Sequence, residues 1–271
     1  MTKYIITLLC IAVFFSCASE NNSKSVKQES LETKQPISSQ KMTTPEVKKE
    51  IPIDFIMGKF NPAVEADFIE VPAKYASRKG MYMQRAAYDA FVKMADAAKK
   101  EDISLQVISA ARNFFRQKSI WEAKWNGQTK VGGKDLSKSL PVAKSRALKI
   151  LEFSSMPGTS RHHWGTDIDI NNLNNSYFNK GRGQKEYEWL QKNAAKFGYC
   201  QPYSPIDEAR PNGYFEEKWH WSYMPLSQPL TDAAEARLRN EMITGFDGSE
   251  TAPEIDVVRN FVLGINQSCR H

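Results

Sequence analysis

Two short motifs hold three of the four histidines in this chain of 271 residues. In the first, Ser160-Arg-His-His-Trp-Gly-Thr-Asp-Ile-Asp, His162 stands seven residues before Asp169. In the second, Glu217-Lys-Trp-His, a carboxylate stands three residues before His220. Catalytic zinc sites use three nitrogen or oxygen ligands from the protein and keep a fourth position for water. Two histidines and one aspartate supply such a set, and a free glutamate nearby can accept a proton from the attacking water.

The spacing alone leaves alternatives open. His163 is adjacent to His162 and competes with it as a ligand. The chain has no H-E-x-x-H, so the arrangement is not that of the helical zinc proteases. In an extended strand, residues three apart point to opposite faces of the sheet. Glu217 and His220 can therefore share a site only if a turn or bulge lies between them.

The composition argues against several other classes of function. The 37 lysines and arginines exceed the 31 acidic residues by six, and the excess is scattered, so we predict no nucleic-acid surface. The fourteen glycines form neither a G-x-G-x-x-G motif nor a phosphate-binding loop. The four cysteines show no C-x-x-C spacing, which argues against a thiolate zinc site or a redox pair.

The first seventeen residues resemble a bacterial lipoprotein signal. Lys3 provides the positive start, an apolar run extends from Tyr4 to Phe15, and Ser16 precedes Cys17. Twelve apolar residues are too few for a membrane helix, which needs about twenty, so the segment is predicted to direct export. We expect Cys17 to be lipidated and to anchor an exported protein to a membrane of the cell envelope. Ordinary cleavage without a lipid is the alternative.

After the signal, residues 18–50 are polar, mixed in charge and almost free of aromatic side chains. Such a segment buries too little apolar surface to fold, so it is predicted to be a disordered tether. The composition becomes globular near residue 51 and shows no repeat or second linker, which predicts one domain over 51–271. Cys200 and Cys269 lie in this exported domain and are candidates for a disulfide, which the sequence does not decide.

The elements that must position the motifs mix helix and strand. Hydrophobic periodicity predicts helices over 83–100, 114–125, 141–153, 185–197, 231–243 and 255–264. Short strands are predicted over 105–110, 166–170 and 219–223. Because strands and helices do not alternate regularly, we predict an α+β domain with a small antiparallel sheet that carries the zinc site, flanked by helices.

Three motifs resemble those of one zinc peptidase family. S-R-H-H-W-G-T-D-I-D is similar to the S-x-H-x-x-G-x-A-x-D motif of the VanY-type D-alanyl-D-alanine carboxypeptidases, relatives of the lysostaphin-type endopeptidases and the hedgehog domain. E-K-W-H resembles the E-x-W-H of that family, and Ser109-Ala-Ala-Arg112 with Gln117 resembles its S-G-Y-R-S-x-x-x-Q segment. The motifs follow the family order across residues 109–220, and the similarity covers 60–225.

The resemblance implies a role for each matching residue. It implies one zinc ion per chain, with three ligands: His162, Asp169 and His220. It makes Glu217 the general base and Arg112 the group that faces either the substrate carboxylate or the tetrahedral oxyanion. Three further residues match positions that line the peptide site: Ser160, Gln117 and, more loosely, Tyr203.

Two departures from the family pattern concern the site. Asp167 stands where the family usually has alanine, which places an extra carboxylate near the metal and makes it a rival for the base. Ala110 and Ala111 replace Gly-Tyr before the arginine, which could reshape the substrate pocket. The aromatic residues around the motifs are expected to be core or pocket wall rather than a platform for sugars: Trp164, Tyr214, Trp219 and Trp221.

The function implied by the resemblance is hydrolysis of the C-terminal D-amino acid of peptidoglycan stem peptides. An L,D-carboxypeptidase, a cross-link endopeptidase and a non-catalytic zinc module that binds the wall are the alternatives. The pair Glu217 and Arg112 argues against the last, because a binding module needs neither. The partners expected are stem peptides and, through the lipid, a membrane; the sequence gives no signal for an oligomeric state.

Overall fold

A computed structural model describes residues 50–270 of the chain. The predicted signal over 1–17, with Cys17, lies outside the described residues, as does the predicted tether over 18–50 except for its last residue. Within residues 50–270, none of the helices combines the length and the apolar character that crossing a membrane requires.

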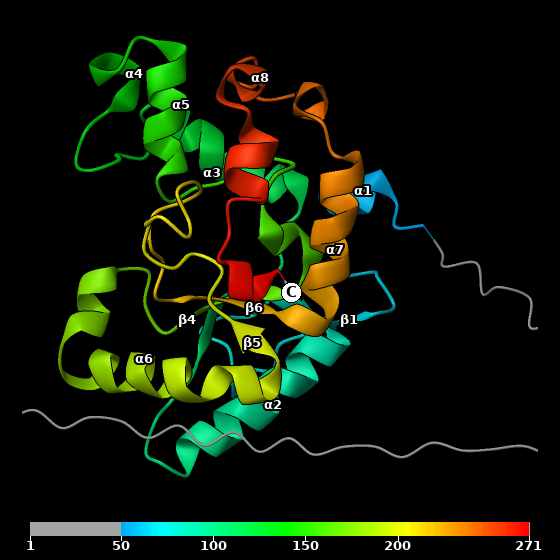
Figure 1. Ribbon diagram of the computed structural model, residues 1–271, viewed down its shortest axis with the longest axis vertical. Coiled ribbons are helices and arrows are strands. Elements are labelled where there is room, and N and C mark those ends of the chain that lie inside the picture. The colour runs from blue at the N-terminus through cyan, green and yellow to red at the C-terminus, as the bar shows by residue number, and fades with distance from the viewer. Residues whose placement is uncertain (1–49, 271) are drawn as a thin grey trace, which may run out of the picture. The chain divides into compact units, whose positions relative to one another are not determined.

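The described chain mixes helices with short strands (Figure 1). The helices are α1 Ile53–Ile56, α2 Arg85–Lys99, α3 Phe114–Trp125, α4 Leu136–Ser139, α5 Ala143–Leu151, α6 Gly181–Asn193, α7 Met224–Arg237 and α8 Thr251–Ile255. The strands are β1 Phe68–Glu70, β2 Tyr82–Gln84, β3 Val107–Ser109, β4 Asp167–Ile170, β5 Tyr199–Cys200 and β6 His220–Tyr223. The predicted α+β class with small antiparallel sheets is confirmed.

Most predicted elements are present, and the largest error concerns α7. The helix expected over 231–243 begins at Met224, directly after β6, and ends at Arg237. Pro225 lies in its first turn, where a backbone N–H has no partner within the helix, so proline is tolerated there. The helix expected over 255–264 is divided, because Asp256 adopts a left-handed conformation at φ 52° between α8 and a π-helical turn, Val258–Val262.

A four-stranded antiparallel sheet in the order β3-β4-β6-β5 organises the motif residues. Side chains alternate between the faces of a strand, so Asp167 and Asp169 of β4 lie on one face and Ile168 on the other. Across the ladder, Asp169 pairs with His220 and Asp167 pairs with Ser222 of β6. One face of the two central strands is therefore polar at every position.

The opposite face of these strands packs into a hydrophobic cluster. Ile168, Ile170 and Trp221 are buried there together with side chains of α2 and α6. A second cluster joins α3, α5, α7 and α8. Figure 1 shows α2 and α6 below the sheet and α3, α5 and α8 above it. The polar face of the two central strands thus lies between two apolar clusters.

Cys200 and Cys269 form a disulfide, which the sequence had left open. Their Cα atoms are 5.8 Å apart and 69 positions separate them in the chain. The bond attaches the last turn of the described chain to β5, the edge strand beside β6. It therefore supports the strand that carries His220 from a segment remote in sequence.

Candidate active site

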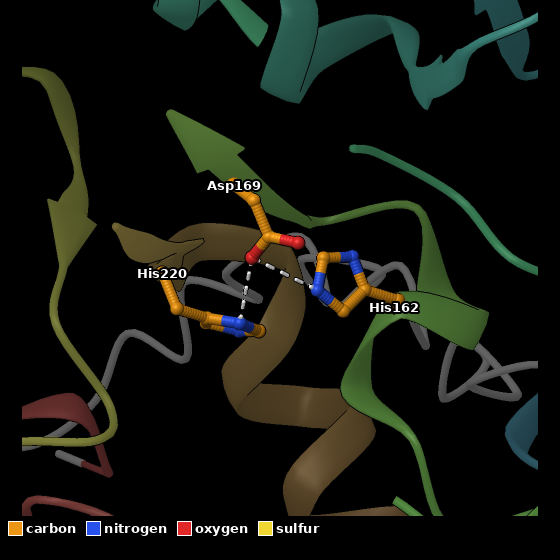
Figure 2. Close-up of side chains that lie close together, drawn as sticks. All are labelled: His162, Asp169 and His220. Atoms are coloured by element: carbon orange, nitrogen blue, oxygen red, sulfur yellow. Dashed lines mark ion pairs between the residues drawn. The ribbon is translucent and has the colours of Figure 1, made fainter. Parts of the chain in front are cut away.

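Two histidine rings converge on one carboxylate oxygen (Figure 2). Nε2 of His162 lies 3.3 Å from Oδ1 of Asp169, and Nδ1 of His220 lies 3.2 Å from the same oxygen. All three residues are buried, and their candidate ligand atoms lie within 4.8 Å of one another. Oδ1 of Asp169 has no hydrogen-bond partner, which is costly for a buried carboxylate unless a cation compensates its charge. The group therefore fits a metal ion, and its two nitrogens and one oxygen suit zinc.

A strand pair and a turn bring these side chains together. Asp169 and His220 stand opposite each other on β4 and β6, so their side chains share the polar face. His162 lies in a 3-10 turn, η1 Arg161–Trp164, which precedes β4. Gly165 ends this turn at φ 69°, and a Cβ there would approach the Phe68 ring to 2.3 Å. Glycine is required at this position for both reasons.

The other ring nitrogen of each histidine is held in place. Nδ1–H of His162 donates to the carbonyl of Ala110 at 3.0 Å, which leaves Nε2 free for a ligand bond. Burial and the charge of Arg112 lower the pKa of His162, which favours the neutral ring that metal binding needs. Nε2–H of His220 donates to Asp167 at 2.9 Å, which leaves Nδ1 facing Asp169.

Three carboxylates surround His220. Burial alone would lower its pKa, but the hydrogen bond to Asp167 and the nearby carboxylates of Asp169 and Glu217 raise the pKa of His220 well above its usual value. These carboxylates favour a positive charge at the ring nitrogens. A cation beside Oδ1 of Asp169 would supply the charge that a proton on Nδ1 otherwise provides.

His163, the rival ligand, has a different role. Its Nε2 accepts a hydrogen bond from the backbone N–H of Gly158 at 3.0 Å, and its Nδ1–H donates to the carbonyl of Arg112 at 2.5 Å. Burial lowers the pKa of His163 to about 3, so the ring is neutral. Both nitrogens are engaged, and the ring braces the backbone of Arg112 against the loop at Gly158.

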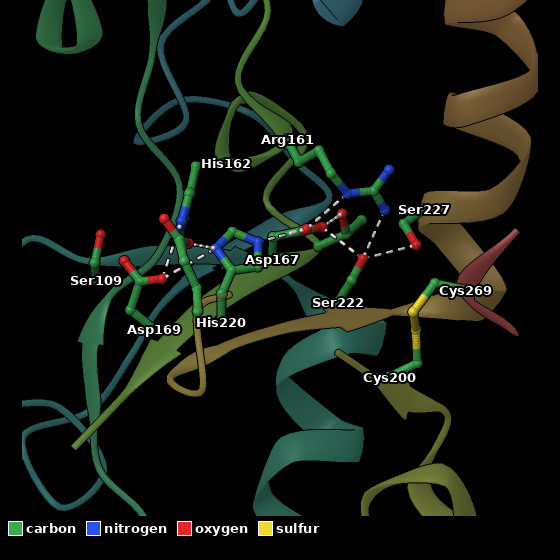
Figure 3. Close-up of polar contacts among 12 residues, drawn as sticks. Ser109, Arg161, His162, Asp167, Asp169, Cys200, His220, Ser222, Ser227 and Cys269 are labelled. Atoms are coloured by element: carbon green, nitrogen blue, oxygen red, sulfur yellow. Dashed lines mark hydrogen bonds and ion pairs between the residues drawn. A yellow bond between two sulfur atoms is a disulfide. The ribbon is translucent and has the colours of Figure 1, made fainter. Parts of the chain in front are cut away.

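Asp167 lies behind His220 rather than on the side of that ring that faces Asp169 (Figure 3). Its Oδ2 accepts from His220 and, at 3.0 Å, from Nε of Arg161, while its Oδ1 accepts from the hydroxyls of Thr166 and Ser222. Burial alone would raise its pKa, but the charge of Arg161 and the bond with His220 hold the pKa of Asp167 well below its usual range. A carboxylate this acidic and fully hydrogen-bonded is unsuited to accept a proton from water, which argues against Asp167 as the base.

A buried network extends from Asp167 into α7. Arg161 is 1% exposed and donates to the hydroxyls of Ser222 at 2.8 Å and Thr231 at 2.9 Å. Ser222 gives its only hydroxyl hydrogen to Asp167, so the bond of 2.9 Å between the hydroxyls of Ser222 and Ser227 has Ser227 as the donor. A buried arginine needs a carboxylate and further acceptors to offset its desolvation, and this network supplies them. Asp167 therefore connects His220 to a rigid part of the fold.

We predict that Asp167→Asn weakens zinc binding by about 10- to 100-fold, the usual effect of removing the carboxylate that orients a ligand histidine. Titration of the metal-loaded protein with a competing chelator measures this. Asp96→Asn, a change at an aspartate of α2 outside the site, is the matched control. Equal zinc affinity in the Asp167 variant, the Asp96 variant and the wild type would contradict the role given to Asp167.

Glu217 reaches the same site through a turn. The backbone N–H of His220 donates to the carbonyl of Glu217 at 3.2 Å, so the chain turns just before β6 begins. This is the irregularity that the spacing of the motif requires. Oε2 of Glu217 consequently lies 3.3 Å from Nδ1 of His220. Burial raises the pKa of Glu217, although the contact with His220 opposes the shift, and a raised pKa suits a base that works near neutral pH.

Arg112 and Gln117 border the metal group from the other side. Nη1 of Arg112 lies 3.7 Å from Oδ2 of Asp169 and donates to the hydroxyl of Ser109 at 2.9 Å. Gln117, on α3, donates to the carbonyl of Ser155 at 2.8 Å. Nε of Arg112 and Oε1 of Gln117 are buried without hydrogen-bond partners. Both groups therefore retain capacity for a polar ligand.

A pocket of about 500 Å³ opens onto this cluster. The predicted site residues that line it are Arg112, Gln117, His162, Asp169, Tyr203, Glu217 and His220. The ring centre of Tyr203 lies 4.7 Å from that of His220. Ser160 is buried just before η1 and its hydroxyl has no partner, but it is not part of the pocket lining, so its contact with substrate stays a prediction. Of the four aromatic residues, Tyr214 and Trp219 form pocket wall, whereas Trp164 and Trp221 lie in the core.

Several pocket residues escaped the sequence analysis. They are Ile120, Lys124, Phe153, Ser154, Ser155, Leu173, Asn174 and Asn175. For two of them the sequence held a signal, because Ile120 and Lys124 follow Gln117 at positions i+3 and i+7 and so share its face of the predicted helix. The others lie in loops or at the start of a short 3-10 turn, whose approach to the site no local periodicity reports.

Comparison with known proteins matches residues 80–226 to the VanY family, described as D-alanyl-D-alanine carboxypeptidase. The chain is 30% identical over 165 residues to "Putative carboxypeptidase YodJ" of Bacillus subtilis (strain 168), covering 60% of this chain and 52% of that protein. It is 28% identical over 131 residues to a D-alanyl-D-alanine carboxypeptidase of Enterococcus faecalis (strain ATCC 700802 / V583), covering 48% and 44%. The chain thus spans about half the length of these curated relatives.

Two solved structures are similar at lower identity. One is a mutant of the vancomycin resistance D,D-pentapeptidase VanY from a VanB-type cassette in complex with Zn(II), at 24% identity and a TM-score of 0.43, covering 60% of this chain and 88% of that one. The other is the LdcB LD-carboxypeptidase, at 24% identity and a TM-score of 0.45, covering 73% and 76%.

The family match includes all three motifs on which the resemblance was based, from Ser109 to His220. It also includes both strands that carry candidate ligands, β4 and β6, and the turn that carries His162. Because the match extends over more than half of the sequence, the chain belongs to the VanY family of D-alanyl-D-alanine carboxypeptidases.

Proposed function

We propose that the protein is a zinc-dependent carboxypeptidase that removes the C-terminal D-amino acid from peptidoglycan stem peptides. One observation carries the proposal: the three candidate ligand atoms of His162, Asp169 and His220 converge in the same pocket that Glu217 and Arg112 line. Membership of the VanY family supports the same reaction class. A free base and a cationic side chain beside a three-ligand group are what peptide hydrolysis requires, whereas simple metal binding needs neither.

Zinc at this group would polarise the scissile carbonyl and acidify the attacking water. Glu217 would accept the proton of that water and deliver it to the leaving amine, a transfer that contributes about 10²–10⁴ in rate. Its carboxylate is near enough to do so, because Oε2 lies 3.3 Å from the ring nitrogen of His220 that faces the metal position. Arg112 would donate from its planar guanidinium to the oxygen on which negative charge develops.

Digestion of purified muropeptides by the zinc-loaded full chain, followed by mass spectrometry, tests the proposal. Loss of one terminal D-alanine from pentapeptides is the expected result. Loss of D-alanine from tetrapeptides would instead identify an L,D-carboxypeptidase, and cleavage of dimers would identify an endopeptidase. Intact substrates of every kind, with zinc bound, would overturn the proposal in favour of a wall-binding module.

We further propose that the protein is exported and held at a membrane of the cell envelope by lipid on Cys17. The apolar run from Tyr4 to Phe15 with a small residue before Cys17 supports this. Fractionation of cells that make the full chain should find it with membranes, and Cys17→Ser should release it to the soluble fraction. Equal membrane association of the two proteins would contradict the lipid anchor.

A further inference from the structure

A second cationic side chain lines the pocket beside Arg112. Lys124 lies on α3, seven residues after Gln117, and both side chains face the pocket together with Ile120. Cα–Cβ bonds in a helix tilt toward its N-terminus, so the stem of Lys124 leans toward the end of α3 that follows Arg112. The peptide site therefore contains two positive charges where the motifs alone indicated one.

Lys124 has no acidic partner within the described part of the chain. Its ammonium group donates to the hydroxyl of Ser154 and forms no ion pair there. Burial and the charge of Arg112 lower the pKa of Lys124, while the charge of Glu217 opposes the shift. A partly buried ammonium next to another cation is destabilised unless an anion joins it. The pocket is therefore prepared for an anionic group of a ligand.

The two cations occupy different places relative to the metal group. Arg112 touches it, since Nη1 lies 3.7 Å from Oδ2 of the candidate ligand Asp169. Lys124 forms no hydrogen bond or ion pair with any of the three ligands. Its backbone lies seven residues after Gln117 on α3, which is about 10 Å along the helix axis at a rise of 1.5 Å per residue. In a carboxypeptidase substrate, the scissile carbonyl lies at the metal and the free carboxylate lies one residue, about 3.5 Å of extended chain, farther on.

We propose that Lys124 binds the free C-terminal carboxylate of the substrate, while Arg112 serves the carbonyl oxygen beside the metal. The inference rests on the proposed carboxypeptidase function and makes Lys124 the residue that selects chain ends over internal bonds. An ammonium group with one neutral protein partner retains donors for the carboxylate. The family resemblance left two roles open for Arg112, at the substrate carboxylate or at the tetrahedral oxyanion. With Lys124 at the carboxylate, Arg112 has only the role at the oxyanion.

The test compares a peptide ending in D-alanyl-D-alanine with its C-terminal amide, using the zinc-loaded full chain. Lys124→Met removes the charge but keeps the apolar stem. It should lower kcat/KM for the free acid by about 10- to 100-fold, mainly through KM, because one charge-assisted hydrogen bond is lost. Hydrolysis of the amide should change little, and Lys124→Arg should keep most of the preference for the acid. If the wild type does not cleave the amide, the affinities of both peptides are measured instead. Glu217→Gln is compared with the double variant Glu217→Gln, Lys124→Met, and the preference for the free acid should again fall when Lys124 is replaced.

The controls separate this role from a structural one. Ser154→Ala removes the hydrogen-bond partner of Lys124 but keeps its charge, so it should retain the preference for the acid. If Ser154→Ala reproduces the effect of Lys124→Met, Lys124 only braces the loop and the inference is overturned. The acid-to-amide ratio is measured within one preparation, so a partly unfolded variant does not distort it.

Two other outcomes are also decisive. In the first, Lys124→Met keeps the wild-type ratio of acid to amide hydrolysis, whereas Arg112→Lys loses it. That result would assign the substrate carboxylate to Arg112 and overturn this inference, but not the proposed function. A wild-type chain that holds zinc but cleaves and binds neither peptide would overturn the proposed function and this inference with it. The first outcome leaves hydrolysis of the free acid by the wild type intact, so the two failures are distinguishable.

Discussion

Glu217→Gln is expected to lower peptide hydrolysis by about 10²–10⁴-fold while the protein keeps its zinc. The glutamine retains the size of the side chain but cannot accept a proton. Zinc should stay because the three candidate ligand atoms come from other residues. Single-turnover hydrolysis of a stem pentapeptide and elemental analysis of the same sample measure the two properties together.

Glu216→Gln is the matched control for this prediction. Glu216 precedes the proposed base but is not part of the pocket lining, so its replacement should leave hydrolysis near the wild-type rate. Asp167 provides the counter-test, because it contacts His220 and, unlike Asp169, is not one of the three candidate ligands. Wild-type turnover in Glu217→Gln, together with loss of turnover in a zinc-saturated Asp167→Asn, would show that the two roles assigned here are reversed.

The second large effect is expected from His220→Ala, which should lose both the metal and all measurable hydrolysis. Only two protein ligands would remain, and the buried carboxylates of Asp167 and Asp169 would each lose a ring partner. His162→Ala should behave in the same way. Elemental analysis after dialysis should find about one zinc per chain in the wild type and nearly none in either variant.

His163→Gln distinguishes the ligand pair from their neighbour. Its ring braces the backbone at Arg112 and Gly158, so the variant should keep zinc and lose about 1–3 kcal/mol of stability to unsatisfied buried backbone groups. Thermal unfolding of the zinc-loaded protein measures that loss. Zinc retained in His162→Ala but lost in His163→Gln would be incompatible with the ligand set and would make His163 the ligand.

The local elements could be predicted from the sequence because their causes are local. Alternation of polar and apolar residues in Thr166-Asp-Ile-Asp-Ile places two aspartates on one face of a strand, and β4 has that arrangement. Periodic apolar positions predict a helix over 114–125, which coincides with α3. The spacing of Glu217 and His220 demands a turn between them, and the turn is there. The motif order likewise indicates the family, and the match over residues 80–226 confirms it.

The division of work within the site was decided only by contacts between distant segments. Nothing near His162 in the chain distinguishes it from His163; the carbonyls of Ala110 and Arg112, about 50 residues away, fix which ring faces Asp169. Asp167 was expected near the metal because it stands where the family motif usually has alanine, but antiparallel pairing of β4 with β6 places it behind His220. Lys124 joins the pocket only because the fold brings α3 to the same cavity as Asp169 of β4 and His220 of β6. Periodicity reports which face of an element is apolar, whereas the partner of a buried polar atom depends on how the elements pack in three dimensions.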